Sequence, residues 1–241
     1  GCEKDCETME ESFMRFPIRL TCCLLLTALA AAAQAQTDAA RDYPNKAVHI
    51  VIPFSAGGGN DIAARVISAK LTNTLNQPVV VENRPGAQGF IAGQFVAKAE
   101  PDGYTVLMGP TGPMVISPAI YSKMPYSTLK DFAPVTMIGS FPLVLIVDSK
   151  LPVNSVAELV KYARSRPTEI NYGSTSATFQ LTSELFNLRA GTRFQHIPYK
   201  GSNEMITAVI SGQVTIAFPD PPPLLGVLKS GRVRAARSIA T

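Results

Sequence analysis

The stretch with the clearest chemical potential is the glycine-rich segment at residues 53–59, Pro-Phe-Ser-Ala-Gly-Gly-Gly. It follows a short β-branched apolar run, Val48–Ile52, which predicts a buried strand. It precedes an apolar segment in which Asn60 or Asp61 can cap a helix. A strand, a glycine loop and a helix start bring unpaired backbone N–H groups and the positive end of a helix dipole to one place. Such a place suits a carboxylate or a phosphate.

The loop fits neither of two common nucleotide-binding motifs. It lacks the Gly-Lys-Ser/Thr ending of a P-loop, and the adjacent Gly57, Gly58 and Gly59 do not have the Gly-x-Gly-x-x-Gly spacing. A tight turn that binds nothing explains the same glycines. The residues therefore leave two readings open, an anion site without an obvious nucleotide and a plain turn.

Strands and helices alternate after this loop. The pattern predicts a strand over 78–83, a helix over 89–98, a turn at 101–103 and a strand over 104–108. A βαβαβ pattern implies an α/β fold with mostly parallel sheets and ligands at the carboxyl ends of the strands. The segment Gly109–Pro113 follows the third strand, so we expect it to face the loop Ser55–Gly59.

The second half of the chain continues the alternation after a connector at 117–132 without clear periodicity. The expected extended segments are 135–138, 143–147, 170–173, 194–199 and 213–218, and the expected helices are 155–166, 179–188, 204–211 and 224–229. Ser155 and Glu158 form a capping box. A hydroxyl-rich loop, Ser174–Thr178, precedes one helix as a counterpart of the glycine loop, although an ordinary Ser/Thr helix start accounts for it equally.

The first 36 residues are not expected to belong to the fold. From Met14 the sequence has a positive region with Arg15 and Arg19, an apolar core and the small-residue site Ala33-Gln34-Ala35. This pattern predicts a cleavable signal peptide, preceded by an upstream extension at 1–13. The apolar run is too short to span a bilayer comfortably. The predicted location of the mature chain is the periplasm.

Cysteine usage and charge agree with export. All four cysteines, Cys2, Cys6, Cys22 and Cys23, lie in the predicted leader, so the mature chain has neither a disulfide nor a thiolate metal site. Without the five acidic and three basic residues of the leader, the formal net charge rises from +4 to +6. The basic residues are scattered and do not alternate with aromatic residues, which argues against nucleic-acid binding.

An ordered set of motifs resembles the solute-binding receptors of tripartite tricarboxylate transporters, the Bug family of bacterial periplasmic proteins. The segments that carry the resemblance cover most of the mature chain: Tyr43-Pro44, Pro53–Gly58 with Asp61 and Arg65, Val81–Ala87, Pro101–Thr105, Asn171–Ser174, Pro198–Gly201 and Gly231–Arg234. The resemblance implies a two-lobed, type II periplasmic-binding-protein fold that closes over a small organic ligand. The implied lobes are 37–141 and 142–234.

The resemblance also implies the binding residues. In the family, a ligand carboxylate is held mainly by backbone amides and ordered waters, which avoids the cost of burying an ion pair. In the first lobe the implied binding residues are Phe54, Ser55, Ala56, Gly57, Gly58, Asp61, Thr111 and Gly112. In the second lobe they are Ser174, Thr175, Ser176, Tyr199, Lys200 and Asp220. The implied partners are a small organic acid and the membrane subunits of the transporter, with no cofactor and with a monomeric receptor.

The sequence departs from the family in two places. The segment Ser174–Phe179 is shorter than in many relatives, and Gln180 lies near the position where they have a histidine. Relatives also continue beyond Arg234 with a strand and a further segment that complete the first lobe, whereas only 235–241 follow here. The expectation is a first lobe that lacks its closing elements, through a frameshift or a truncated gene.

Two other function classes remain as alternatives: a periplasmic enzyme that processes carboxylates, and a nonfunctional fragment. The two histidines, His49 and His196, both lie in predicted strands. The sequence contains neither a Gly-x-Ser-x-Gly nor a His-Glu-x-x-His motif, and the mature chain has no cysteine nucleophile. We therefore expect no catalysis. Which organic acid is bound is left open by the residues.

Overall fold

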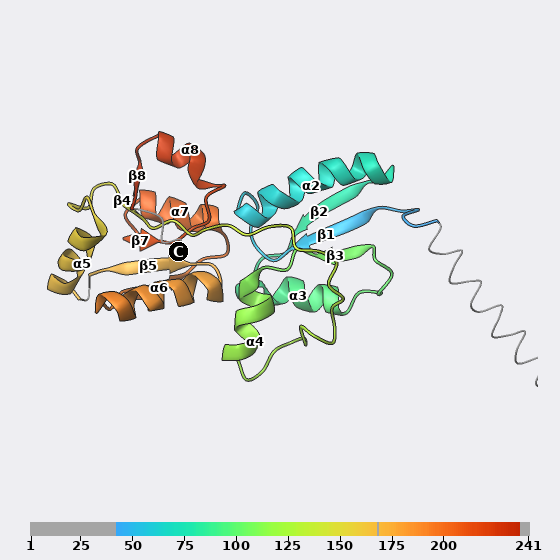
Figure 1. Ribbon diagram of the computed structural model, residues 1–241, viewed down its shortest axis with the longest axis horizontal. Coiled ribbons are helices and arrows are strands. Elements are labelled where there is room, and N and C mark those ends of the chain that lie inside the picture. The colour runs from blue at the N-terminus through green and yellow to red at the C-terminus, as the bar shows by residue number, and fades with distance from the viewer. Residues whose placement is uncertain (1–41, 168, 237–241) are drawn as a thin grey trace, which may run out of the picture. The chain divides into compact units, whose positions relative to one another are not determined.

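A computed structural model describes residues 42–167 and 169–236 (Figure 1). The helices and strands discussed below lie in the compact unit Lys46–Thr241. The predicted signal peptide from Met14 and residues 237–241 at the other end of the chain lie outside the described residues.

The first sheet contains three parallel strands, β1 (Val48–Ile52), β2 (Val79–Asn83) and β3 (Thr105–Leu107). Their order is β2-β1-β3, so the first strand in sequence lies in the middle. The helix α2 (Gly59–Leu75) contributes Ala64, Leu71 and Leu75 to an apolar cluster with alternate residues of β1. The predicted βαβαβ unit is therefore confirmed, and the carboxyl ends of its three strands share one edge.

The helix α3 (Phe90–Ala97) follows a single 3₁₀ turn, η1 (Ala87–Gly89). Ala87, Gln88 and Gly89 all have positive φ angles of 45°, 55° and 100°. Gly89 adopts its positive φ without strain. The position also has little room for a side chain, because an added Cβ would lie 3.1 Å from atoms of both Pro53 and Pro113. The turn therefore packs between the chain segments that leave β1 and β3.

A loop after the third strand is held against α3 by aromatic rings. The chain first forms a π-helical turn, η2 (Gly112–Ile116), and a short helix, α4 (Ser117–Ile120). Tyr126 then meets Phe90 and Phe132 edge to face, with ring centroids 6.2 and 5.4 Å apart. Its hydroxyl donates to the Pro113 carbonyl at 3.1 Å, and burial raises the pKa of Tyr126 to about 12.

One expected extended segment, 135–138, is not a strand in the structure. Val135 and Met137 are 82 % and 86 % exposed. A β-branched, apolar run forms a strand only when a neighbouring strand pairs with it, and none of the described residues does so here. The strand prediction at this position was wrong.

The second sheet has five strands in the order β6-β5-β7-β4-β8. Their bounds are β4 Ile146–Asp148, β5 Asn171–Ser174, β6 Gln195–Pro198, β7 Ile216–Ala217 and β8 Val233–Ala235. The pairs β5–β6 and β5–β7 are parallel, whereas β4 runs antiparallel to both β7 and β8. The predicted mostly parallel character holds for the half of this sheet that contains β5.

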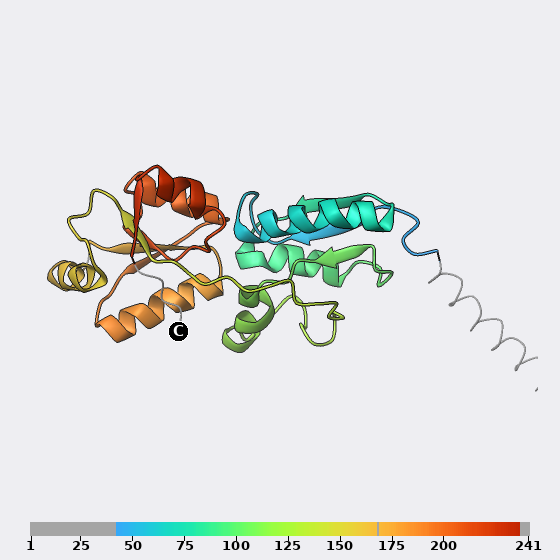
Figure 2. The same ribbon diagram turned by 45° about the horizontal axis from the view of Figure 1, so that its top comes forward.

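Helices cover both faces of the second sheet (Figure 2). On one face, α5 (Val156–Ser165) and α6 (Ala177–Ala190) pack through Leu159, Ala163 and Phe186 onto Tyr172 and Ile216. On the other face, α7 (Ser202–Ile210) and α8 (Leu224–Lys229) enclose side chains such as Ile146 and Ala217. The side chains on both faces of this sheet are therefore buried in apolar clusters.

The predicted capping box at α5 is present in a modified form. Ser155 accepts a hydrogen bond from the Glu158 backbone N–H at 3.2 Å. The Glu158 carboxylate accepts from the backbone N–H of Asn154, at 2.7 Å, one residue earlier than the usual partner.

Two helical glycines provide a matched pair for testing the first lobe's packing. A Cβ at Gly93 would lie 2.3 Å from the Tyr126 ring, whereas a Cβ at Gly226 meets nothing within 4 Å. We expect Gly93→Ala to lower the free energy of unfolding by about 1–3 kcal/mol through overpacking. Gly226→Ala should instead raise it by about 0.5–1 kcal/mol, because Gly is the poorer helix former. Urea denaturation measures both, and an unchanged midpoint for Gly93→Ala would contradict the described packing.

Candidate functional site

The glycine loop is shaped by the buried carboxylate of Asp61, which is 3 % exposed. One of its oxygens accepts hydrogen bonds from the Gly57 backbone N–H and from Arg65 Nε, both at 2.9 Å. The other oxygen accepts from Asn83 Nδ2 at 2.9 Å, and the same amide donates to the Phe54 carbonyl at 3.1 Å. These bonds tie the loop to its own helix and to the end of β2.

This network corrects the expected helix cap. The N-cap residue is Gly58, whose own side chain cannot cap, and neither Asn60 nor Asp61 takes that position. Gly57 has a φ of 82°, which a glycine adopts without strain. Asp61 instead lies in the first turn of α2, where a negative charge is favoured by the helix dipole.

The Asp61 carboxyl stays ionised because its partners outweigh its burial. Burial alone raises the pKa of Asp61, whereas hydrogen bonds from Arg65, Gly57 and Asn83 lower it, and the net shift is downward from 3.8. The Arg65 side chain is itself half exposed, so water still reaches the guanidinium side of this ion pair. The carboxylate therefore stabilises the conformation of the loop, and each of its oxygens already accepts a hydrogen bond from the protein.

The beginning of α7 lies against the glycine loop. The Ser55 backbone N–H donates to the Lys200 carbonyl at 3.2 Å, and Ser55 Oγ donates to Glu204 at 3.2 Å. Asn203 Nδ2 donates to the Ala56 carbonyl, also at 3.2 Å. The loops that end β1 and β6 therefore meet directly, although they belong to different sheets.

Asp220 approaches the start of α2 from the chain that leaves β7. It is 7 % exposed and accepts a hydrogen bond from Ser202 Oγ at 3.0 Å. Its other oxygen fills the space that a side chain at Gly59 would need, at 1.6 Å from the ideal Cβ position. Gly59 is therefore required for this close approach.

The hydroxyl-rich loop forms the other part of the candidate site. Ser174, Thr175 and Ser176 are all buried. Ser174 Oγ lies 2.6 Å from His196 Nε2, and Ser176 is the N-cap residue of α6 without a side-chain capping bond. A Cβ at Gly112 would lie 2.8 Å from Ser176 Oγ, so the turn after β3 packs against this loop.

The structure brings most of the predicted binding residues together in two groups. Ser55, Ala56, Gly57 and Gly58 lie beside Lys200 and α7, with Asp220 next to Gly59, and Gly112 lies beside Ser176. Tyr199 lies next to the second group, because its backbone N–H donates to the Ser174 carbonyl at 2.8 Å. Phe54 is buried and Asp61 is fully bonded within the first lobe. Within 42–167 and 169–236, no hydrogen bond joins the side chains of Thr111 or Thr175 to another predicted residue.

Sequence reasoning missed four residues of this region, namely His196, Ser202, Asn203 and Glu204. For Ser202, Asn203 and Glu204 a usable signal existed, since small polar residues after Gly201 begin a helix directly after a strand. His196 had no such signal. Its contact with Ser174 depends on the pairing of β5 with β6, which is not encoded locally.

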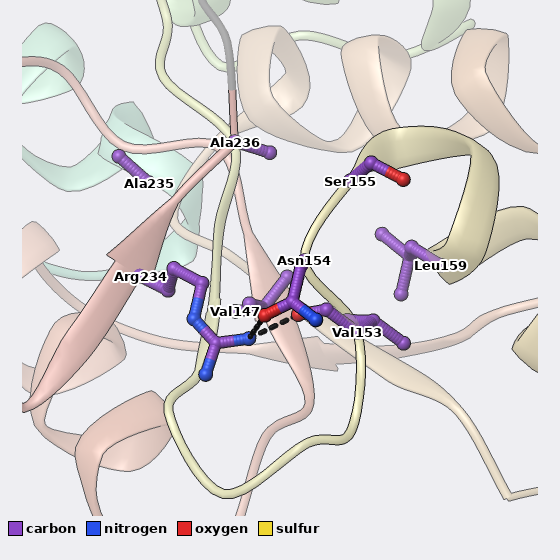
Figure 3. A pocket seen from close by; sticks show the side chains of 8 residues that line it. All are labelled: Val147, Val153, Asn154, Ser155, Leu159, Arg234, Ala235 and Ala236. Carbon is purple, nitrogen blue, oxygen red and sulfur yellow. Dashed lines mark hydrogen bonds between the residues drawn. The ribbon is translucent and has the colours of Figure 1, made fainter.

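A small cavity away from these loops is lined by residues that hydrogen-bond to one another (Figure 3). It lies between β8 and the turn before α5, with Val153, Asn154 and Arg234 in its wall. The Arg234 guanidinium donates to the Val153 carbonyl, to Asn154 Oδ1 at 3.2 Å and to the Ser149 carbonyl at 3.0 Å. Arg234 thus ties β8 to the start of α5, and little more than a water molecule fits beside it.

Neither a metal-ligand cluster nor a membrane-spanning helix is present among the described residues. Across 42–167 and 169–236, no group of three or more His, Cys, Asp or Glu side chains could hold a metal ion. In the same residues, none of the helices has the length and apolar character that crossing a membrane requires.

Replacing Asp61 tests its role in shaping the loop. We expect Asp61→Asn to lower the free energy of unfolding by about 1–3 kcal/mol at pH 7, because an acceptor bound to Arg65 and Gly57 is replaced. The lowered pKa means that ionised Asp61 stabilises the fold above pH 3.8, and this contribution is lost as the pH falls through the folded-state pKa. The difference between the two proteins should therefore shrink in acid.

Denaturation by urea at several pH values measures this difference. Asp131→Asn is a suitable control, since the Asp131 carboxylate is exposed and accepts from the nearby Ser127 N–H at 2.7 Å. An equal loss in both variants would show that Asp61 has no special role in the loop.

Comparison with known proteins shows which family the chain resembles. Residues 63–240 match the profile of the tripartite tricarboxylate transporter family receptor. The chain is 36 % identical over 210 residues to the protein BugT of Bordetella pertussis, an alignment that covers 86 % of this chain and 64 % of BugT. The chain thus spans less than two thirds of that relative's length.

Solved structures with the same fold include two with bound ligands. R. palustris Rpa4515 with adipate has a TM-score of 0.80 and 37 % identity, covering 83 % of this chain and 68 % of that one. MatC of Rhodopseudomonas palustris with bound malate has a TM-score of 0.76 and 29 % identity, with coverage of 83 % and 68 %. The fold is thus the two-lobed α/β fold of type II periplasmic binding proteins. The chain belongs to the tripartite tricarboxylate transporter receptor family, which includes the Bug proteins.

Proposed function

We propose that this chain is an extracytoplasmic receptor that binds a small organic carboxylate between its two lobes. The observation that carries the proposal is the glycine loop at the start of α2. Asp61 fixes its conformation by accepting a hydrogen bond from the Gly57 N–H. The charge of the Asp61 carboxylate is offset by its ion pair with Arg65, which weakens its repulsion of an approaching anion. The other backbone N–H groups of the loop, together with the helix dipole, then supply neutral donors to the ligand.

The facing lobe supports the same proposal. Buried hydroxyl groups at Ser174 and Ser176 lie at the carboxyl end of β5, where ligands of parallel sheets bind. Hydroxyl groups can donate to a carboxylate without carrying a counter-charge that must be desolvated. Two relatives of known structure carry adipate and malate, both small dicarboxylates, so a dicarboxylate is the ligand class proposed here.

Closure of the lobes is the proposed mechanism of capture. The glycine loop and the start of α7 already meet through Ser55, Ala56 and Asn203. A ligand that contacts both loops favours the closed arrangement by its differential affinity for it. The closed receptor, a periplasmic monomer in this proposal, would then deliver its ligand to the membrane subunits of a tripartite transporter.

A thermal-shift experiment with adipate and malate tests the proposed function. A ligand at 100 times its dissociation constant should stabilise the chain by about 2.7 kcal/mol, which is a readily measured rise in Tm. A series of neutral diamides of the same length serves as the ligand control. A cooperative melt that neither acid shifts would count against the dicarboxylate receptor.

Gly112→Ala tests whether the two loops must meet. Its new methyl group would lie 2.8 Å from Ser176 Oγ, so closure should cost about 1–3 kcal/mol and weaken dicarboxylate binding roughly 5- to 150-fold. Gly139→Ala is the matched control, because nothing lies within 4 Å of its Cβ position. Isothermal titration calorimetry compares the two, and equal affinities would place the ligand away from this contact.

A further inference from the structure

His196 has no role in the site described so far, yet it makes one of the shortest contacts there. Its Nε2 atom lies 2.6 Å from Ser174 Oγ, in the loop that faces the ligand in the proposed function. Tyr172 and His196 are paired across β5 and β6, and Ser174 lies two residues beyond Tyr172 on the same face of the strand. The sheet register therefore fixes the contact.

The surroundings of His196 hold its ring in one orientation. The ring stacks on Tyr172 with centroids 5.1 Å apart and an interplanar angle of 27°. The Tyr172 hydroxyl donates to Glu184 Oε1 at 2.6 Å, and Asn187 Nδ2 donates to the other oxygen of Glu184 at 3.3 Å. Glu184 is therefore positioned by two donors on the α6 side of the sheet. It is the charged group of the described residues that acts on the imidazole.

In a hydrogen bond between a hydroxyl and an imidazole, either group can be the donor, which gives two possible directions or polarities. In one, the Ser174 O–H donates to an unprotonated Nε2, and Ser174 can then only accept from a ligand. In the other, Nε2–H donates to Ser174 Oγ, and the hydroxyl hydrogen is free for a ligand acceptor. A carboxylate has only acceptors, so it can use Ser174 as a donor only in the second polarity.

We infer that His196 is a positioning residue that donates its Nε2–H to Ser174 and thereby directs the Ser174 O–H toward a ligand carboxylate. The inference rests on the proposed function, since it requires an anionic ligand at Ser174. It also makes carboxylate affinity depend on pH. A protonated imidazole can only donate at Nε2, and its charge strengthens the hydroxyl as a donor to an anion.

The direction of the pH effect follows from the environment of the ring. Burial lowers the pKa of His196 below 6.5, and Glu184 opposes this shift in part. A bound carboxylate favours the protonated ring and raises this pKa, so binding takes up a proton in mildly acidic solution. The affinity for a dicarboxylate should therefore rise as the pH falls toward and below 6.5.

Calorimetry with adipate between pH 5.5 and 8.0 measures this linkage. After correction for the protonation of adipate itself, we expect the dissociation constant to fall roughly three- to tenfold as the pH decreases over this range. His196→Leu should weaken binding and abolish the remaining pH dependence. His196→Gln, whose amide N–H₂ can still donate to Ser174, should restore part of the affinity without restoring the pH dependence.

His49 provides a matched control because it is the other histidine of the chain and lies exposed on β1. His49→Gln should leave the pH dependence of adipate binding unchanged. A pH dependence that survives in His196→Gln, or one that disappears in His49→Gln, would overturn the inference.

A ligand-free measurement separates this inference from the proposed function. In the chain labelled with ¹⁵N-histidine, the NMR shifts of the His196 ring nitrogens report which nitrogen carries the proton. We expect Nε2 to be protonated at pH 7.5, and Ser174→Ala to change the Nε2 shift. An unprotonated Nε2 would refute the inference whether or not adipate binds. Absence of adipate and malate binding with a protonated Nε2 would instead reject only the dicarboxylate receptor.

Discussion

The structure of the candidate site depends on one buried carboxylate, that of Asp61. Asp61 collects donors from three directions, namely its own helix, the loop before it and the end of the neighbouring strand. Because a buried charge without partners is unstable, this arrangement fixes the three elements relative to one another. The loop is consequently ordered by its own contacts, and in the proposed receptor little ordering entropy would be lost on binding.

The two halves of the proposed site offer different chemistry to the proposed ligand. On the first lobe the donors belong to the backbone, and their direction is set by the glycine conformations. On the second lobe the nearby groups are side-chain hydroxyls, whose hydrogens can rotate and must be directed by a neighbour such as His196. In the proposed receptor, the first half would therefore favour any anionic group, whereas the second would distinguish ligands by what they donate and accept.

Sequence patterns predicted the local features of this chain well. The run Val48–Ile52 and the helix Leu224–Lys229 have the expected bounds, and Ser155 caps α5 as its spacing from Glu158 indicates. The failures concern non-local pairing. The antiparallel pairing of β4 with β7 and β8, the contact of His196 with Ser174 and the unpaired state of 135–138 all depend on which distant strand lies alongside. Asp61 was expected near the helix cap, but its burial against Asn83 decided its role. The predicted lobe boundary at 141 and 142 and the binding residues themselves stay predictions.

The strand order of the second sheet has a consequence for how the chain can fold as it is made. The three strands of the first sheet are complete once Leu107 has been synthesised. In the second sheet, β4 lies between β7 and β8, so its two neighbours are synthesised about 70 and 90 residues later. The edges of β4 therefore have no strand to pair with until the ribosome has added the residues of β7 and β8. A chain with this topology gains from being kept unfolded until translation ends, because an early, unpaired β4 would invite pairing with other molecules.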